Sequence, residues 1–203
     1  MNKKIVVLAS GNGTNFSALF RYLKRKKLPA EIVSLISDNP ESNALLIALA
    51  HGVPSHTIDF KRKVKEEANS ELHQRLKELE PDLIVTAGYM RILPEPIIAS
   101  FPNKIINIHP SLLPAFKGLK AIAQAKNYGV KVTGCTTHFV DASIDGGYII
   151  LQEVLKIKPN MTEDDIHSAV QKLEHKILPK SVHLFLTGKL SIQDRTVIIE
   201  EIS

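Results

Sequence analysis

Two patterns of hydrophobic positions alternate along the first half of the chain. The run at residues 5–9 has no polar interruption, which is typical of a strand buried on both faces, and further strands are expected at 31–37, 54–58 and 83–87. Between them, apolar residues recur at helical spacing near residues 16–23, 43–50 and 63–79. This alternation predicts an α/β fold, a Rossmann-like open twisted, mostly parallel sheet with helices on both faces.

The second half continues with longer elements. A helix is expected at about 121–127, and strands are expected at 130–140 and 148–154. The run Thr162-Glu163-Asp164-Asp165 has the pattern of a helix cap, so a long helix should begin there and extend to about Leu186.

Composition narrows the class of protein. The 203 residues carry a net charge of +5, with basic runs at 24–27 and 61–65. Neither run is interleaved with aromatic residues and the chain has no Trp, so we expect solvated basic turns rather than nucleic-acid binding. No segment is long enough for a membrane span. The single cysteine, Cys135, excludes an internal disulfide and a thiolate metal cluster, and it favours the reducing cytoplasm.

A glycine-containing loop follows the first predicted strand and precedes a helix. In the run Ser10-Gly11-Asn12-Gly13-Thr14-Asn15, glycines would let backbone N–H groups approach an anion at the helix N-terminus. Phe16 occupies the third glycine position of the dinucleotide fingerprint, and no Gly-Lys-Ser/Thr follows. A phosphate monoester is therefore the favoured ligand, and a simple tight turn is the alternative. Asp38, after the second strand, is interpreted as a turn residue.

The loop after the strand at 83–87 is unusually apolar. Met90, Ile92 and Leu93 stand within Gly88-Tyr89-Met90-Arg91-Ile92-Leu93-Pro94. Apolar walls with backbone donors and acceptors suit a flat heterocycle. The alternative is that this loop folds back onto the core.

The most informative run is Asn107-Ile108-His109-Pro110-Ser111-Leu112-Leu113-Pro114. Alternation along a strand places Asn107 and His109 on one face, and Pro110 ends the strand directly after the histidine. An amide donor and a titratable imidazole at the carboxyl end of a parallel strand form a candidate site, because ligands bind at that edge of open α/β sheets.

A second run, from Gly134 to Ile150, completes a known pattern. N-x-H-P-S-L-L-P followed by G-x-T-x-H-F-V-x-x-x-x-D-x-G resembles the folate-dependent formyltransferases, and the resemblance extends from about Lys4 to Leu190. It implies a single formyltransferase domain over residues 1–203, with a nucleotide-phosphate half at about 1–100, a catalytic and folate half at about 101–190, and a short C-terminal extension.

The resemblance also implies a reaction and its residues. The formyl group of 10-formyltetrahydrofolate, a co-substrate, would pass to the amine of glycinamide ribonucleotide in purine biosynthesis, without a metal or covalent adduct. Asn107 would stabilise the oxyanion, His109 would handle the proton, and Asp145 would favour imidazolium and order a water molecule. The ribonucleotide would contact Gly13, Thr14, Asn15 and Glu174. The folate would contact Lys65, Met90, Arg91, Ile92, Leu93 and Asn107.

Some positions depart from the family pattern. Lys65 stands where arginine is common, Tyr148 where proline is common, and Lys117 and Lys120 where proline and histidine are frequent. From the residues alone, His138 is interpreted as a structural neighbour of the site.

Three alternatives stay open. Formyltransferases acting on methionyl-tRNA are expected to carry a further C-terminal domain, and formyltetrahydrofolate hydrolases a further N-terminal one. A noncatalytic nucleotide-binding module is the third. We expect small-molecule substrates, no nucleic-acid or membrane partner, and a monomer or homodimer.

Overall fold

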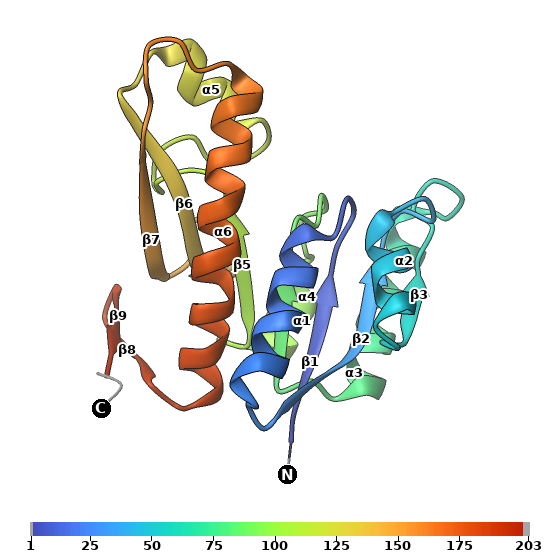
Figure 1. Ribbon diagram of the computed structural model, residues 1–203. Coiled ribbons are helices and arrows are strands. Elements are labelled where there is room, and N and C mark those ends of the chain that lie inside the picture. Colours follow the sequence, from blue (N-terminus) through green and yellow to red (C-terminus); the bar gives the residue numbers. More distant parts are fainter. Residues whose placement is uncertain (1, 201–203) are drawn as a thin grey trace. The chain divides into compact units, whose positions relative to one another are not determined.

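The computed structural model describes residues 2–200, and Figure 1 shows its helices and strands. Seven strands form one sheet in the order β3-β2-β1-β4-β5-β6-β7. Their bounds are β1 (Lys3–Leu8), β2 (Ala30–Ser37), β3 (Ser55–Thr57), β4 (Leu83–Thr86), β5 (Ile105–His109), β6 (Val132–Phe139) and β7 (Ile149–Lys156). The pairs β1–β2, β1–β4 and β2–β3 are parallel, whereas β6 and β7 are antiparallel. The predicted α/β fold with a mostly parallel sheet is therefore confirmed.

The chain divides into two compact units, Met1–Ile106 and Asn107–Ser203. This division lies close to the predicted boundary between the halves. The expectation of a single functional domain stays a prediction.

The first unit is built on β1, which is fully buried from Ile5 to Leu8. Its helices are α1 (Thr14–Lys26), α2 (Asn43–Ala50), α3 (Lys65–Leu79) and α4 (Glu95–Ser100). In Figure 1, α1 and α2 lie in front of the strands, whereas α3 and α4 lie behind them. This arrangement follows from the right-handed crossovers of parallel strands, which reverse face where the strand order changes direction at β1.

The second unit packs α6 (Glu163–Leu186) against the β6–β7 pair, and α5 (Ala121–Tyr128) against α6. The hydroxyls of Thr137 on β6 and Ser181 on α6 lie 2.6 Å apart in this buried interface. The predicted cap of α6 is confirmed, because the Thr162 side chain accepts from the backbone of Asp165 while the Asp165 side chain accepts from the backbone of Thr162.

Two features were not predicted. The helix α4 has only six residues and begins at two closely spaced prolines, Pro94 and Pro96, so its apolar spacing is too short to detect. The C-terminal extension contains a hairpin, β8 (Leu190–Gln193) and β9 (Thr196–Ile199).

Candidate active site

Asn107 lies on β5, within the second unit, and its amide is oriented by His138. The Asn107 Nδ2 atom lies 3.1 Å from His138 Nε2, and His138 Nδ1 lies 2.9 Å from the backbone oxygen of Phe139. A carbonyl only accepts, so His138 Nδ1 carries a proton and donates to it. In the neutral ring, Nε2 then accepts from the Asn107 amide. One hydrogen of that amide is thereby engaged, which fixes the direction of the second.

Burial keeps His138 in this neutral form. Its side chain is 3% exposed. Removal from water lowers the pKa of His138, against the opposing effects of the Phe139 hydrogen bond and the Asp145 charge. A neutral imidazole at pH 7 is therefore available as the hydrogen-bond acceptor of Asn107.

His109, at the end of β5, faces oxygen atoms with both ring nitrogens. Its Nε2 atom lies 2.8 Å from the backbone oxygen of Phe116, and its Nδ1 atom lies 3.3 Å from Asp145 Oδ2. Only the imidazolium form can donate to both acceptors at once. The ring is buried, with 7% of the side chain exposed, so its orientation is well fixed. The arrangement can hold a proton and deliver it.

The Asp145 carboxylate is held in place by its loop. Asp145 Oδ2 accepts a hydrogen bond from the Gly118 backbone N–H at 2.8 Å, and Asp145 Oδ1 lies 3.7 Å from His138 Nε2. The left-handed backbone conformation falls on Asp145 itself, with φ 46°, and not on the glycines that follow. A Cβ at Gly147 would lie 1.8 Å from the Phe139 backbone oxygen, so close packing requires a glycine at this position.

The structure therefore brings Asn107, His109 and Asp145 together, as predicted, and adds His138 as the link between Asn107 and the carboxylate. The signal for His138 was its position two residues after Thr136 on the strand face that turns away from α6. Sequence reasoning placed it near the site but did not identify its bond to Asn107.

Glu174 lies half-buried on α6, and its charge acts on Cys135 of β6. Burial, followed by the charge of Glu174, raises the pKa of the Cys135 thiol to about 12. A thiol of this kind is not a nucleophile at neutral pH.

The glycine loop of the first unit is anchored to the start of α2. The Gly11 carbonyl accepts from the Ala44 backbone N–H at 3.1 Å and from the Ser42 hydroxyl at 2.7 Å. Gly13 is the residue before α1 and has φ 69°. Glycine has no side chain that could accept a hydrogen bond from the backbone N–H groups of the first turn, which include those of Thr14 and Asn15. Asn15 is buried and Thr14 is half-buried. The three predicted phosphate residues thus share one helix N-terminus.

The apolar loop lines a pocket of about 230 Å³ in the first unit. Four of the predicted folate residues meet there, together with two that sequence reasoning missed; the lining is Phe60, Lys65, Asn69, Met90, Arg91 and Ile92. Met90 and Ile92 are 64% and 72% exposed, whereas Leu93 is 6% exposed and belongs to the core. The alternative that the loop folds back onto the core therefore holds for Leu93 and not for its neighbours.

Asp38 does not make the turn that was assigned to it. The turn is held by Ser37 and Asn39, because the Asn39 N–H donates to Ser37 Oγ and the Glu41 N–H donates to Asn39 Oδ1. Asp38 instead accepts from Arg91 Nε at 2.8 Å and is 6% exposed. Sequence reasoning could not pair two residues so far apart in the chain.

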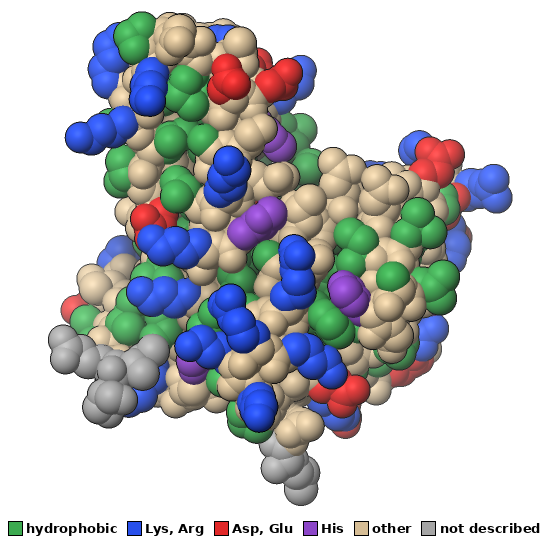
Figure 2. Space-filling view, in the orientation of Figure 1, with side chains coloured by type: hydrophobic (Ala, Val, Ile, Leu, Met, Phe, Trp, Pro, Cys, Tyr) green, Lys and Arg blue, Asp and Glu red, His purple; other side chains and the backbone are tan. Residues whose placement is uncertain are grey.

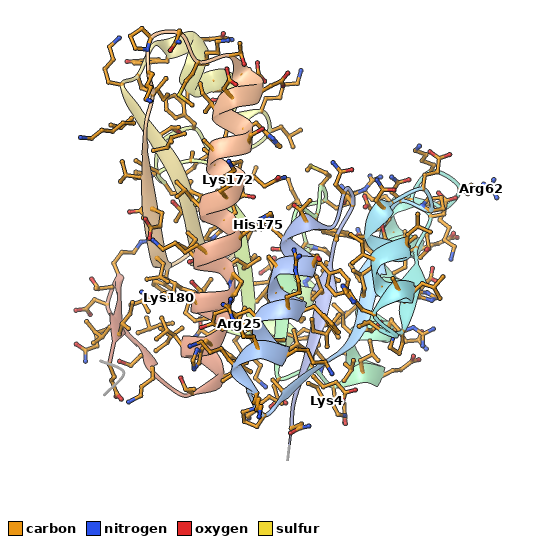
Figure 3. The ribbon with its side chains drawn as sticks, viewed as in Figure 1. Lys4, Arg25, Arg62, Lys172, His175 and Lys180 are labelled. Atoms are coloured by element: carbon orange, nitrogen blue, oxygen red, sulfur yellow. The ribbon has the colours of Figure 1, made fainter. Side chains whose placement is uncertain are left out.

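The two basic runs lie at helix ends, as predicted. Residues 24–26 close α1, where Lys and Arg side chains gather at the surface, as Figure 2 shows. Residues 61–64 precede α3, and the Arg62 side chain, labelled in Figure 3, is 88% exposed.

Within residues 2–200, no helix is both apolar enough and long enough to cross a membrane. Across the same residues, no three His, Cys, Asp or Glu side chains are grouped so as to hold a metal ion.

Residues 3–182 match the formyl transferase family. Phosphoribosylglycinamide formyltransferase of Bacillus subtilis is 40% identical over 91% of this chain and 95% of that protein. The trifunctional purine biosynthetic protein adenosine-3 of Gallus gallus is 39% identical over 93% of this chain. The chain spans only 19% of the length of that larger relative.

Solved structures give the same result. Glycinamide ribonucleotide transformylase 1 from Symbiobacterium toebii superimposes with a TM-score of 0.94, at 39% identity, over 98% of this chain and 95% of that one. A formyltetrahydrofolate deformylase from Pseudomonas syringae superimposes with a TM-score of 0.93, at 26% identity, over 99% of this chain and 67% of that one. By family match, identity and coverage, the chain belongs to the formyl transferase family.

Proposed function

We propose that this protein is a phosphoribosylglycinamide formyltransferase. It transfers the formyl group of 10-formyltetrahydrofolate to the primary amine of glycinamide ribonucleotide, and it yields formylglycinamide ribonucleotide and tetrahydrofolate in purine biosynthesis. The observation that carries the proposal is the group of Asn107, His109 and Asp145, in which His109 is buried and both of its ring nitrogens face acceptors. The Bacillus subtilis relative, which matches nearly end to end, bears this name.

The first chemical step forms a tetrahedral intermediate. The amine nitrogen attacks the formyl carbon, and the carbonyl oxygen becomes an oxyanion. The second hydrogen of the Asn107 amide, aimed by the bond to His138, donates to that oxyanion.

The second step breaks the bond between the formyl carbon and the folate nitrogen. The attacking amine loses a proton and the leaving nitrogen gains one. His109 supplies and recovers that proton, directly or through a water molecule, because it lies against Asp145 at 3.3 Å and the carboxylate stabilises its charged form. Atoms and charge therefore balance without a covalent enzyme adduct.

The binding groups come from helices α1, α3 and α6, from strand β5 and from the loop after β4. The N-terminus of α1, at Gly13, Thr14 and Asn15, binds the phosphate of the ribonucleotide, and Glu174 of the second unit contacts the same substrate. Met90 and Ile92 provide apolar walls for the folate ring system, with Leu93 behind them. Lys65 and Arg91 bind the carboxylates of its glutamate tail. Asn107 also contacts the folate.

The test is a spectrophotometric transfer assay with 10-formyltetrahydrofolate and glycinamide ribonucleotide. We expect Asn107→Ala and His109→Ala to remain folded and to lose turnover by about 10²–10³, the typical cost of one oxyanion donor for Asn107→Ala. Asn127→Ala and His167→Ala, at exposed helical positions, are the matched controls and should keep wild-type rates. Near wild-type turnover of Asn107→Ala would exclude the mechanism.

A hydrolase is the second candidate, because the deformylase from Pseudomonas syringae shares the fold. The same assay separates the two functions. Folate release that depends on the ribonucleotide supports the transferase, whereas release in its absence supports the hydrolase.

We further propose that the protein works in the cytoplasm as a monomer or homodimer, without a metal. Sedimentation velocity across a concentration series tests the oligomeric state. Unchanged transfer rates after treatment with a chelator test the metal independence.

A further inference from the structure

The first unit contains a buried carboxylate that the proposed reaction does not use, and this carboxylate is paired with the pocket residue Arg91. Asp38 is 6% exposed, and its Oδ2 atom accepts from Arg91 Nε at 2.8 Å. Its Oδ1 atom is buried and makes no hydrogen bond within the described residues. A carboxylate removed from water is costly unless it is paired, so Asp38 and Arg91 are held to each other.

A second contact holds the same guanidinium. The Arg91 Cζ atom lies 4.6 Å from the centre of the Phe60 ring, which is the geometry of a cation–π contact. Phe60 also lines the pocket beside Lys65. The edge of the guanidinium is therefore fixed by Asp38 and its face is fixed by Phe60.

These contacts use only part of the donor set of Arg91. A guanidinium has five N–H groups, and Asp38 takes the one on Nε. Within residues 2–200, the two terminal nitrogens of Arg91 donate no hydrogen bond, and the side chain is 41% exposed. These nitrogens form the edge that binds a carboxylate through two parallel hydrogen bonds.

We propose that Asp38 and Phe60 are positioning residues, which hold the Arg91 guanidinium ready to accept a carboxylate of the folate glutamate tail. This inference rests on the proposed function and adds to it. An unrestrained arginine loses several rotatable bonds when it binds an anion, whereas a restrained one has lost them already. Asp38 offsets the positive charge of Arg91, which weakens the attraction of the pocket for an anion, but it also fixes the orientation of the guanidinium.

The two effects of Asp38, on charge and on orientation, predict opposite results for Asp38→Asn. If net charge governed tail binding, removal of the Asp38 charge would tighten it. If positioning governs it, Asp38→Asn weakens binding although the pocket becomes more positive. We expect the KM for 10-formyltetrahydrofolate to rise about five- to tenfold in Asp38→Asn, in line with the ordering of one long side chain. The kcat and the KM for glycinamide ribonucleotide should change by less than about twofold, because Arg91 contacts neither the reacting atoms nor the ribonucleotide in the proposed complex.

A substrate without the tail separates positioning of Arg91 from a general structural role of Asp38. Only positioning predicts a loss that is confined to the substrate with the tail. In 10-formyltetrahydropteroyl amide, an uncharged amide replaces the glutamate. The wild type and Asp38→Asn should use this compound with equal kcat/KM. Arg91→Ala should reduce the difference between the two substrates to what Lys65 alone supplies, and Asp38→Asn should add nothing in the Arg91→Ala background.

Matched variants isolate the effect. Glu78→Gln removes another carboxylate paired with an arginine of the same unit, Arg75 at 3.2 Å, and should leave all constants unchanged. Phe60→Tyr keeps the ring and its contact with the guanidinium, so the KM for the intact folate should rise less than in Phe60→Leu. Phe60→Leu keeps an apolar side chain without the ring and should raise the KM for the intact folate only.

Each outcome decides the proposal. Tighter or unchanged folate binding in Asp38→Asn overturns it, as does an equal loss with the tail-free compound or an additive effect with Arg91→Ala. Should Asp38→Asn fail to fold, as judged by circular dichroism, Phe60→Leu decides in the same way. A wild type that transfers formyl groups but does not distinguish the two folates would overturn this inference alone. A wild type without transfer would overturn the proposed function.

Discussion

Gly13 shows how strongly a single position can be constrained. Its backbone has φ 69°, and a Cβ added there would lie 2.7 Å from the Ala44 Cα atom. Neither the conformation nor the neighbouring backbone of α2 can adjust freely. We predict that Gly13→Ala lowers the free energy of unfolding by about 1–3 kcal/mol, measured by urea denaturation. It should also raise the KM for glycinamide ribonucleotide.

Gly11 is the matched control for that prediction. It belongs to the same loop and its backbone is not left-handed. A Cβ added at Gly11 would have no heavy atom within 4 Å. Gly11→Ala should keep the wild-type stability. Equal stability losses in both variants would show that the loop, and not the close approach of Gly13 to α2, sets the constraint.

At the scale of one element, α6 depends on its first turn. The Thr162 side chain accepts from the Asp165 N–H at 3.1 Å, and the Thr162 N–H donates to Asp165 Oδ2 at 2.8 Å. These two bonds satisfy groups that the helix leaves without partners. We predict that Thr162→Ala lowers the free energy of unfolding by about 1 kcal/mol.

The reciprocal bonds make that prediction specific. Because both residues share one cap, Thr162→Ala combined with Asp165→Ala should cost less than the sum of the two single changes. The Thr162 hydroxyl also lowers the pKa of Asp165, so NMR titration of Asp165 should show a higher pKa in Thr162→Ala. An unchanged titration would mean that the cap is not formed in solution.

At the scale of the whole molecule, the shifted acidic and histidine groups favour stability at neutral pH. Burial lowers the pKa values of His138 and His73. As the pH falls below about 6.5, these two rings bind protons in the unfolded chain but stay neutral in the folded protein. The free energy of unfolding therefore falls with the pH. The lowered pKa values of Glu71 and Asp82 extend the same effect to pH values below about 4.

For His138, His73, Glu71 and Asp82, the sign of the pH dependence is therefore the same. We predict that the free energy of unfolding falls steadily from pH 7.5 to pH 3.5, as measured by urea denaturation at each pH. His138→Asn should flatten the part of the curve between pH 6.5 and 5. A stability maximum below pH 6 would contradict the assignment of His138 as a neutral buried ring.

Much of this fold could be read from the chain because its signals are local. The buried run of β1, the apolar spacing of α1 and the cap at Thr162 each lie within a few consecutive residues, and the structure places them as expected. The short helix α4 and the C-terminal hairpin were not predicted, because each is too short for its hydrophobic pattern to be distinguished from that of a loop.

The candidate site divides in the same way. By itself, the sequence determined that Asn107 and His109 share one face at a strand end, because spacing along one strand fixes which side chains share a face. Its resemblance to the formyltransferases indicated Asp145 as the third candidate. Only the tertiary structure decided that His138 orients Asn107, that Leu93 belongs to the core, and that Asp38 holds Arg91. These facts depend on contacts between residues that are distant in the chain, and such contacts form only when strands and loops are brought together by packing.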